Sequence, residues 1–214
     1  MNNAVEDELL DRNPAEKLGR FTKVDAEQKV KASAMSRDEA ARFLKTAEEA
    51  YPNFYPLFLT ALRAGLRRGE LVALKWGDIQ FGAGEDDPNR YILVQRNWVY
   101  GSFTSPKSKK SRRVDLSRQL RRVLLELRDK RLLGAFLSGR SSLSDELVFP
   151  SETGTVLQPE NLYHRYFLPC LESAGLRRFR FHDLRHTFGS LLIQDGASLA
   201  YVKEQMGHSS IQIT

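Results

Sequence analysis

The chain has 214 residues, a formal net charge of +6 and an ordinary hydrophobic content of 41%. No apolar run approaches the roughly 18 residues that a membrane-spanning helix needs, and the acidic start is unlike a secretory signal. A single cysteine, Cys170, excludes an internal disulfide framework and is typical of a reducing compartment. Its apolar neighbours predict a buried thiol. These features indicate a cytoplasmic protein with one domain and an appendage.

Residues 1–33 differ in character from the rest of the chain. Asn13-Pro14 marks a break, and the stretch after it is charged, with no hydrophobic period. Their formal charge balance is −1, so the rest of the chain carries +7. We interpret residues 1–33 as the tail of a preceding domain plus a linker, and residues 34–214 as the principal domain.

Three helical segments are predicted next. Ser36 and Glu39 have the spacing of a capping box and open an amphipathic helix that reaches about Ala50. A second helix ends at Gly65. The following segment, GLRRGELVALKWGDI, restarts at once as a short helix that ends near Trp76.

The hydrophobic period then changes to that of strands. Segments 91–94, 98–100 and 113–116 are rich in β-prone residues and predict a small three-stranded antiparallel sheet. A long basic helix starts at Ser117, and a further helix covers about residues 159–174. The inward residues expected on the long helix are Leu120, Val123, Leu124, Leu127 and Leu132. The predicted fold is therefore α+β and mainly helical.

The last part of the chain carries a polar cluster. His182, Arg185 and His186 lie at positions i, i+3 and i+4, so a helix would place them on one face. Gly196 is expected to end this helix and Ser198 to cap the next one. Gly207 suits the position just past that helix and His208 follows directly. Such a cluster of imidazole and guanidinium groups suits a phosphate.

The pair His182 and His186 also has the spacing of a helical zinc site. Arg185 would repel a cation there, and no third ligand is evident nearby, so we expect no metal. The segment 107–131 carries eleven Lys or Arg and three Asp or Glu, a balance of +8. This basic stretch is typical of a protein that binds the DNA backbone; the alternative is an ordinary solvated helix face.

Four motifs together resemble the catalytic domain of the tyrosine recombinases, the phage integrase family of site-specific DNA recombinases. Residues 64–71 (AGLRRGEL) resemble the first arginine box of the family, and Lys107 stands where the lysine of its β-hairpin falls. Residues 182–186 (HDLRH) match the H-x-L-R-H box. Residues 206–210 (MGHSS) match the Gly-His box. The resemblance covers roughly residues 34–214 and implies the helical catalytic domain of DNA breaking-rejoining enzymes.

The resemblance implies strand cleavage by a tyrosine, through a 3′-phosphotyrosyl intermediate and without a cofactor. Arg67 and Arg185 would bind the non-bridging oxygens as bidentate forks, and Lys107 would protonate the departing 5′-oxygen. His182 and His208 would complete the phosphate pocket. The supporting residues would be Glu70, which lies on the same predicted helix face as Arg67, and His186. The predicted DNA contacts are Lys109, Lys110, Arg112, Arg113 and Arg180.

The family's nucleophilic tyrosine follows the Gly-His histidine by about nine residues, which would place it near position 217, beyond Thr214. Tyr201 precedes His208 and does not replace it. We therefore expect this chain to bind duplex DNA weakly as a monomer without cutting it, and the longer protein to act as a tetramer on DNA. Two alternatives are a DNA-binding regulator on the same fold and an unrelated helical DNA binder.

Overall fold

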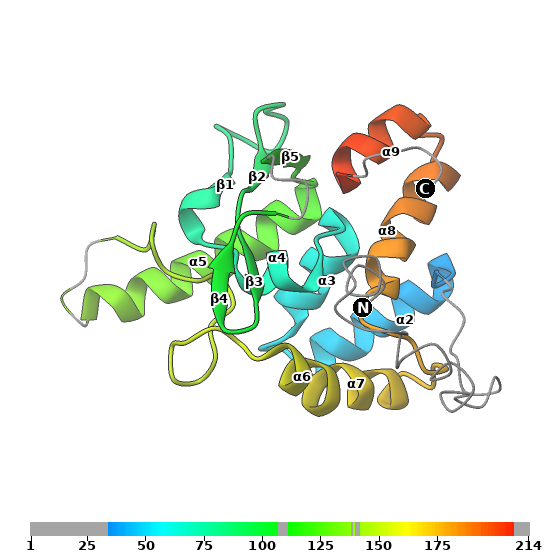
Figure 1. The fold of residues 1–214 in the computed structure, drawn as a ribbon, viewed down its shortest axis with the longest axis horizontal. Coiled ribbons are helices and arrows are strands. Elements are labelled where there is room, and N and C mark those ends of the chain that lie inside the picture. Colours follow the sequence, from blue (N-terminus) through cyan, green and yellow to red (C-terminus); the bar gives the residue numbers. More distant parts are fainter. Residues whose placement is uncertain (1–33, 107–110, 138, 140–141, 208–214) are drawn as a thin grey trace, which may run out of the picture. The chain divides into compact units, whose positions relative to one another are not determined.

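The computed structural model describes residues 34–106, 111–137, 139 and 142–207. Figure 1 shows their arrangement. The helices are α2 (Arg37–Ala50), α3 (Tyr55–Ala64), α4 (Arg68–Val72), η3 (Trp76–Asp78), α5 (Arg118–Leu137), α6 (Pro159–Asn161), η4 (Leu162–Phe167), α7 (Leu168–Ser173), α8 (Asp183–Gln194) and α9 (Leu199–Met206). The strands are β1 (Ile79–Gln80), β2 (Tyr91–Val94), β3 (Asn97–Val99), β4 (Ser102–Thr104) and β5 (Arg112–Asp115). The mainly helical α+β fold is confirmed.

Local signals set several helix ends as the sequence predicts. The Ser36 hydroxyl accepts from the Glu39 backbone N–H at 3.1 Å, and the Glu39 carboxylate accepts from the Ser36 N–H at 2.8 Å. The Ser198 side chain caps α9 in the same manner. Gly65 and Gly207 end α3 and α9 in the left-handed conformation, with φ of 57° and 64°.

The sheet differs from the predicted one in its third strand. It has the order β1-β2-β5 and is antiparallel, with Ile79 opposite Ile92 and Val94 opposite Arg112. The predicted strand 98–100 instead belongs to a separate hairpin, in which β3 pairs with β4. The chain reverses at Tyr100 and Gly101, where φ is 48° and 82°, so Tyr100 belongs to the turn. The true third strand, β1, has two residues and shows no readable alternation.

The helix expected to reach Trp76 is also shorter than predicted. α4 ends at Val72, and residues 76–78 form a separate 3₁₀ turn. Asp78 accounts for the break, because its buried carboxylate accepts from the backbone N–H of Lys75 at 3.0 Å and pairs with Arg96. Such side-chain-to-backbone bonds compete with helix continuation.

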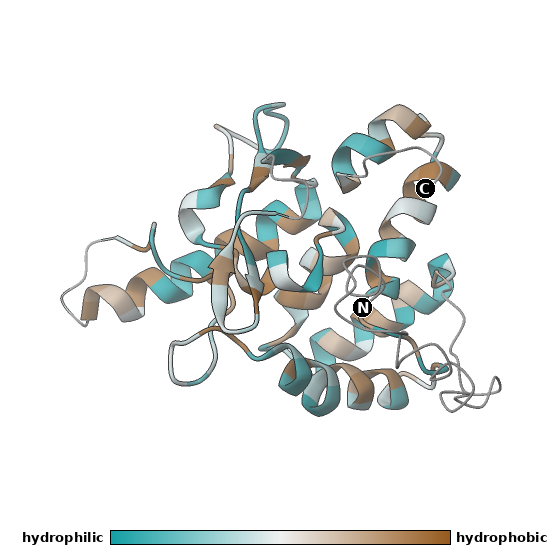
Figure 2. Ribbon diagram, in the orientation of Figure 1, coloured by the Kyte–Doolittle hydropathy of each residue, from teal (hydrophilic) through white to brown (hydrophobic). Residues whose placement is uncertain are grey.

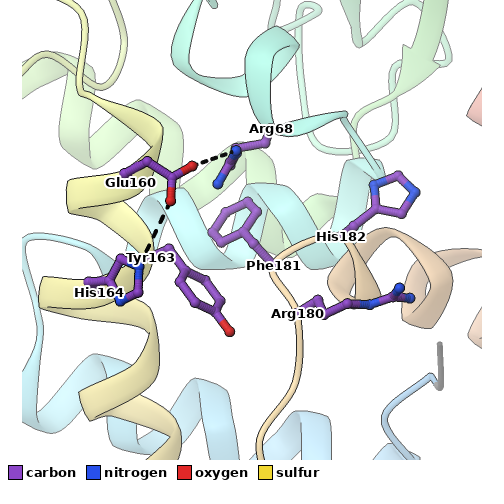
Figure 3. A pocket seen from close by; sticks show the side chains of 7 residues that line it. All are labelled: Arg68, Glu160, Tyr163, His164, Arg180, Phe181 and His182. Atoms are coloured by element: carbon purple, nitrogen blue, oxygen red, sulfur yellow. Dashed lines mark hydrogen bonds and ion pairs between the residues drawn. The ribbon is translucent and has the colours of Figure 1, made fainter. Parts of the chain in front are cut away.

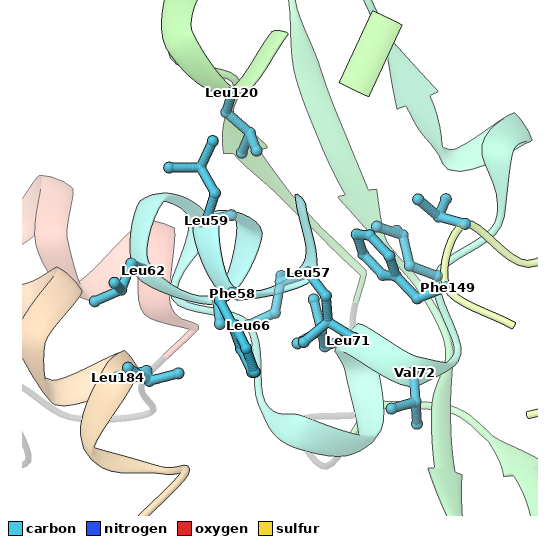
Figure 4. Packing of buried hydrophobic residues seen from close by; sticks show 14 of the residues in the cluster. Leu57, Phe58, Leu59, Leu62, Leu66, Leu71, Val72, Leu120, Phe149 and Leu184 are labelled. Carbon is cyan, nitrogen blue, oxygen red and sulfur yellow. The ribbon is translucent and has the colours of Figure 1, made fainter. Parts of the chain in front are cut away.

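The apolar core surrounds α3. Helices α2, α5 and α8 all pack against it. In Figure 4, Leu59 of α3 faces Leu120 of α5, and Leu62 faces Leu184 of α8. Cys170 is buried as predicted, and desolvation raises the pKa of its thiol to about 12.

The long helix α5 joins this core mainly through its first half, although Ala135 near its end is also buried. Leu120 and Leu124 are fully buried, as predicted. The prediction for Leu132 is wrong, since that residue is 36% exposed and Phe136 beyond it is 78% exposed. The last turns of α5 extend past the sheet, and Figure 2 shows that they remain hydrophobic. Among the described helices, none is both long and apolar enough to cross a membrane.

Candidate active site: an arginine cluster at the end of α9

Arg67 lies at the junction between α3 and α4. Its backbone is extended, so it precedes α4 and does not lie on the helix face that the sequence suggests. The expected contact with Glu70 is present: the Arg67 N–H donates to Oε2 and Nη1 donates to Oε1, both at 2.9 Å. The Arg67 side chain is 26% exposed. Its guanidinium is thus fixed on one side and accessible on another.

Glu70 is the anionic centre of the site, and its side chain is fully buried. The two terminal nitrogens of Arg112, on β5, donate hydrogen bonds to the two carboxylate oxygens of Glu70, at 2.9 and 2.8 Å. Desolvation raises the pKa of Glu70, but the hydrogen bonds and charges of Arg112 and Arg67 outweigh it and lower the pKa to about 2. Glu70 is therefore ionised at neutral pH.

Arg185 of α8 lies beside these groups and is 2% exposed. Its Nη1 donates to the carbonyl of Gly65 and its Nη2 to the carbonyl of Met206. Desolvation and the charges of Arg67 and Arg112 lower its pKa to about 9, so it remains a cation at neutral pH. The structure thus brings Arg67 and Arg185 together, although they come from distant motifs.

His182 stands at the start of α8, and its ring centroid lies 4.9 Å from that of His186. Desolvation and the positive neighbours His186, Arg185 and Arg180 lower the pKa of His182 to about 4. The imidazole is therefore neutral at neutral pH and offers one N–H donor and one acceptor. Within the described residues, no group of three or more His, Cys, Asp or Glu could hold a metal ion.

His182 also lines a pocket of about 410 Å³. The full lining is Arg68, Glu160, Tyr163, His164, Arg180, Phe181 and His182. Figure 3 shows Glu160 on one wall and His182 on the opposite wall. Arg68 pairs with Glu160 at 3.0 Å, and Arg180 pairs with Asp183 at 2.8 Å. The Arg180 side chain is 45% exposed, so this predicted DNA contact is accessible.

The sequence model of the phage integrase family matches residues 33–214. The chain belongs to the phage integrase family. It is 32% identical over 225 residues to a tyrosine recombinase XerC-like protein of Caldanaerobacter subterraneus subsp. tengcongensis, covering 100% of this chain and 57% of that protein. It is 27% identical over 220 residues to the ICEBs1 integrase of Bacillus subtilis, and this match covers 99% of this chain and 55% of that protein. The chain thus spans just over half the length of these relatives.

The fold agrees with this membership. The structure of the Tn1549 transposon integrase in complex with circular intermediate DNA superposes with a TM-score of 0.71. The match covers 99% of this chain and 69% of that one, at 20% sequence identity. At that identity the match establishes a common fold.

The structure describes only some of the other predicted site residues of this integrase-family chain. Lys107, Lys109, Lys110 and His208 lie outside the described residues, as does the predicted tail 1–33. Arg113 is exposed, with its guanidinium 4.5 Å from the centroid of the Tyr91 ring.

Arg112, predicted as a DNA contact, has a side chain that is 9% exposed and lies against Glu70. The alternation of the strand residues is the sequence signal for this placement. Alternation along β5 puts Arg112 on the same inward face as the buried Val114, and Arg113 on the opposite face.

Proposed function

We propose that this chain is the larger part of the catalytic domain of a tyrosine-type site-specific DNA recombinase. Such an enzyme cuts and rejoins duplex DNA through a 3′-phosphotyrosyl intermediate. The observation that carries the proposal is the convergence of Arg67 and Arg185, from segments far apart in the sequence, at the end of α9. Membership of the phage integrase family supports the same reaction.

The chemistry of phosphodiester cleavage suits this cluster. The transition state places negative charge on the non-bridging oxygens, and cations fixed in advance stabilise it without reorganising. Arg67 is partly exposed and presents a fork that matches two phosphate oxygens. Arg185 is held by two carbonyls and adds a fixed positive charge close by. His182, neutral at the pH of the cell, would donate a hydrogen bond to the phosphate.

The remaining roles follow the family resemblance. Lys107 would protonate the 5′-oxygen, His208 would complete the phosphate site, and a tyrosine near position 217 of a longer protein would be the nucleophile. Tyr201 is unsuited to that role. Desolvation and the hydrogen bond that its hydroxyl donates to Asp115, at 2.7 Å, raise its pKa well above the usual range of a tyrosine.

Duplex DNA is the proposed partner. The related Tn1549 integrase was solved in a complex with DNA. The exposed Arg113 and Arg180 would contact the backbone of the duplex, as would Lys109 and Lys110. The longer protein would assemble as a tetramer on DNA, and this chain alone would remain a monomer.

The experiment begins with the reading frame past Thr214 and then uses the full-length protein. A binding site is selected from random duplexes, nicked near its centre and incubated with the protein. We expect a covalent protein–DNA adduct on a denaturing gel, with a free 5′-hydroxyl, that disappears when the downstream tyrosine becomes phenylalanine. Site-specific binding without any adduct would instead support a non-cleaving DNA-binding protein on the same fold.

A further inference from the structure

The end of α9 collects three arginines. Three consecutive backbone carbonyls, those of residues 205–207, each accept a hydrogen bond from a different guanidinium group. The bonds run from Arg112 Nε to Gln205 at 3.1 Å, from Arg185 Nη2 to Met206, and from Arg67 Nη2 to Gly207 at 3.3 Å. These arginines come from β5, α8 and the start of α4, so the end of α9 joins three segments of the fold.

Helix physics explains why cations gather here. The last carbonyls of a helix have no intrahelical partner, and they carry the negative end of the helix dipole. Gly207 turns the chain into the left-handed conformation, and its N–H donates to the carbonyl of Glu204 at 3.0 Å. The carbonyls that follow are thereby left for side chains, and guanidinium groups satisfy them.

Arg112 differs from the other two arginines because all three of its guanidinium nitrogens donate hydrogen bonds. It holds both oxygens of Glu70 and the carbonyl of Gln205. Gly207 packs so closely that a Cβ there would lie 2.7 Å from Arg112 Cδ. No guanidinium nitrogen of Arg112 is therefore left without a partner inside the protein, and its side chain is 9% exposed.

Arg112 also belongs to the polar seam that attaches α9 to β5. In this seam the Asp115 N–H donates to Gln205 Oε1 at 2.8 Å, and the Tyr201 hydroxyl donates to Asp115. The apolar contact of α9 is a small cluster, in which Val202 and Met206 pack on Phe188 of α8. Within the described residues, the bond from Arg112 to the Gln205 carbonyl is therefore one of the polar contacts that hold α9 in place.

We propose that Arg112 is a positioning residue for strand cleavage, which locks Glu70, and through it Arg67, against the end of α9 without contacting DNA. The proposal rests on the function proposed above. Glu70 fixes Arg67 through two hydrogen bonds, and Arg112 fixes both oxygens of Glu70. Removing Arg112 frees the carboxylate to shift toward Arg67 and loosens the carbonyls that orient Arg67 and Arg185.

The test compares Arg112→Gln with Arg96→Gln in the full-length protein. Arg96 is a matched control, because it also pairs with a buried carboxylate, that of Asp78, but lies outside the cluster. Both variants should lower the melting temperature. At saturating DNA, Arg112→Gln should cleave about 100-fold more slowly in a single turnover, a loss comparable with that of one transition-state hydrogen-bond donor. Arg96→Gln should keep the wild-type rate, and the DNA Kd of Arg112→Gln should stay within about threefold of the wild-type value.

A pH profile separates positioning from mere stability. The charges that face Glu70 are those of Arg67, Arg112 and Arg185. Arg112 gives the largest of the effects that lower the pKa of Glu70, so in Arg112→Gln this pKa should lie closer to its ordinary value, and cleavage should fall at a higher pH than in the wild type. In the wild type, Glu70 stays ionised at that higher pH, so its titration should not lower the cleavage rate there.

Each outcome decides the proposal. A folded Arg112→Gln protein that cleaves within about threefold of the wild-type rate would overturn it. Weakened DNA binding at an unchanged saturating rate would also overturn it and make Arg112 a DNA contact. If Arg112→Gln does not fold, Arg112→Lys retains the charge beside Glu70 but not the fork; slow cleavage by this variant supports the proposal, and the wild-type rate overturns it. Failure of the wild type to cleave would refute the proposed function instead.

Discussion

Two groups of arginines in this chain look alike in the sequence and differ in the fold. Arg67 and Arg112 bind Glu70, and together with Arg185 they converge on the end of α9. The arginines of α5 contact other groups: Arg118 pairs with Asp86 and is 66% exposed, and Arg121 donates to a backbone carbonyl at 2.7 Å. The arginines of the first group are bound to several partners, whereas Arg118 and Arg121 each bind one partner among the described residues.

The two groups therefore have different expected roles: the buried arginines fix the positions of neighbouring groups, and the exposed ones contribute to the electrostatic potential of the surface. A buried guanidinium with several partners fixes the position of its neighbours, so its removal is expected to change structure and reaction rate. An exposed guanidinium adds to the positive potential, so its removal is expected to change DNA affinity and salt dependence. The +8 balance of residues 107–131 conceals this distinction, because it counts Arg112, whose charge is neutralised by Glu70.

The largest expected effect comes from the centre of the buried group. Glu70→Gln leaves Arg67 and Arg112 without their shared counter-charge, and should lower the free energy of unfolding by about 3 kcal/mol, the scale of a broken buried ion pair. Urea denaturation measures it. The matched control is Glu160→Gln, which removes the carboxylate partner of Arg68; the Glu160 side chain is 71% exposed. The control should change stability by less than about 0.5 kcal/mol, and equal losses in the two variants would contradict the comparison.

The next largest effect is expected for Gly207→Ala, which should lower the free energy of unfolding by about 2 kcal/mol. The alanine would combine the strain of a left-handed backbone with a clash against Arg112. Gly175→Ala isolates the strain, since Gly175 has φ of 61° and nothing lies within 4 Å of the added Cβ. Gly175→Ala should lower the free energy of unfolding by about 1 kcal/mol. Thermal melts of both variants give the difference, and identical shifts would show that Arg112 yields freely to the added methyl group.

The pH dependence of stability should be smaller. The pKa of His182 is lowered to about 4 in the folded state, so the unfolded chain binds the proton more tightly. Stability should therefore fall as pH drops from 6.5 toward 4, by about 1 kcal/mol once solvent screening is allowed for. His182→Gln should flatten that part of the profile. A profile identical in the two proteins would show that His182 titrates normally.

The smallest effect on stability belongs to the exposed group. Arg118→Gln should change the free energy of unfolding by less than about 0.5 kcal/mol. If Arg118 lies near the phosphates, the slope of log K against log salt should fall by about 1. Titrations of labelled duplex at several salt concentrations measure this slope. A loss of stability above about 2 kcal/mol would place Arg118 with the buried group.

Much of this architecture is readable from local sequence. Ser36, Ser198 and Gly207 set helix ends through contacts within a few residues, so those boundaries were predictable. The pairing of Arg112 with Glu70 was not, because it joins side chains of β5 and α4 that are 42 positions apart in the chain. The third strand escaped prediction for the same reason: two-residue β1 has no pattern of its own and is defined by its pairing with β2.

The measurement that most directly tests the central claim is the single-turnover cleavage rate of Arg67→Lys in the full-length protein, with Arg68→Lys as its neighbour control. Lysine keeps the charge but cannot form the fork that binds Glu70 and phosphate oxygens together. At saturating DNA, we expect Arg67→Lys to cleave about 100-fold more slowly than the wild type, and Arg68→Lys to cleave at a rate close to the wild-type value. Equal rates for Arg67→Lys and the wild type would contradict an arginine cluster that acts through fixed geometry.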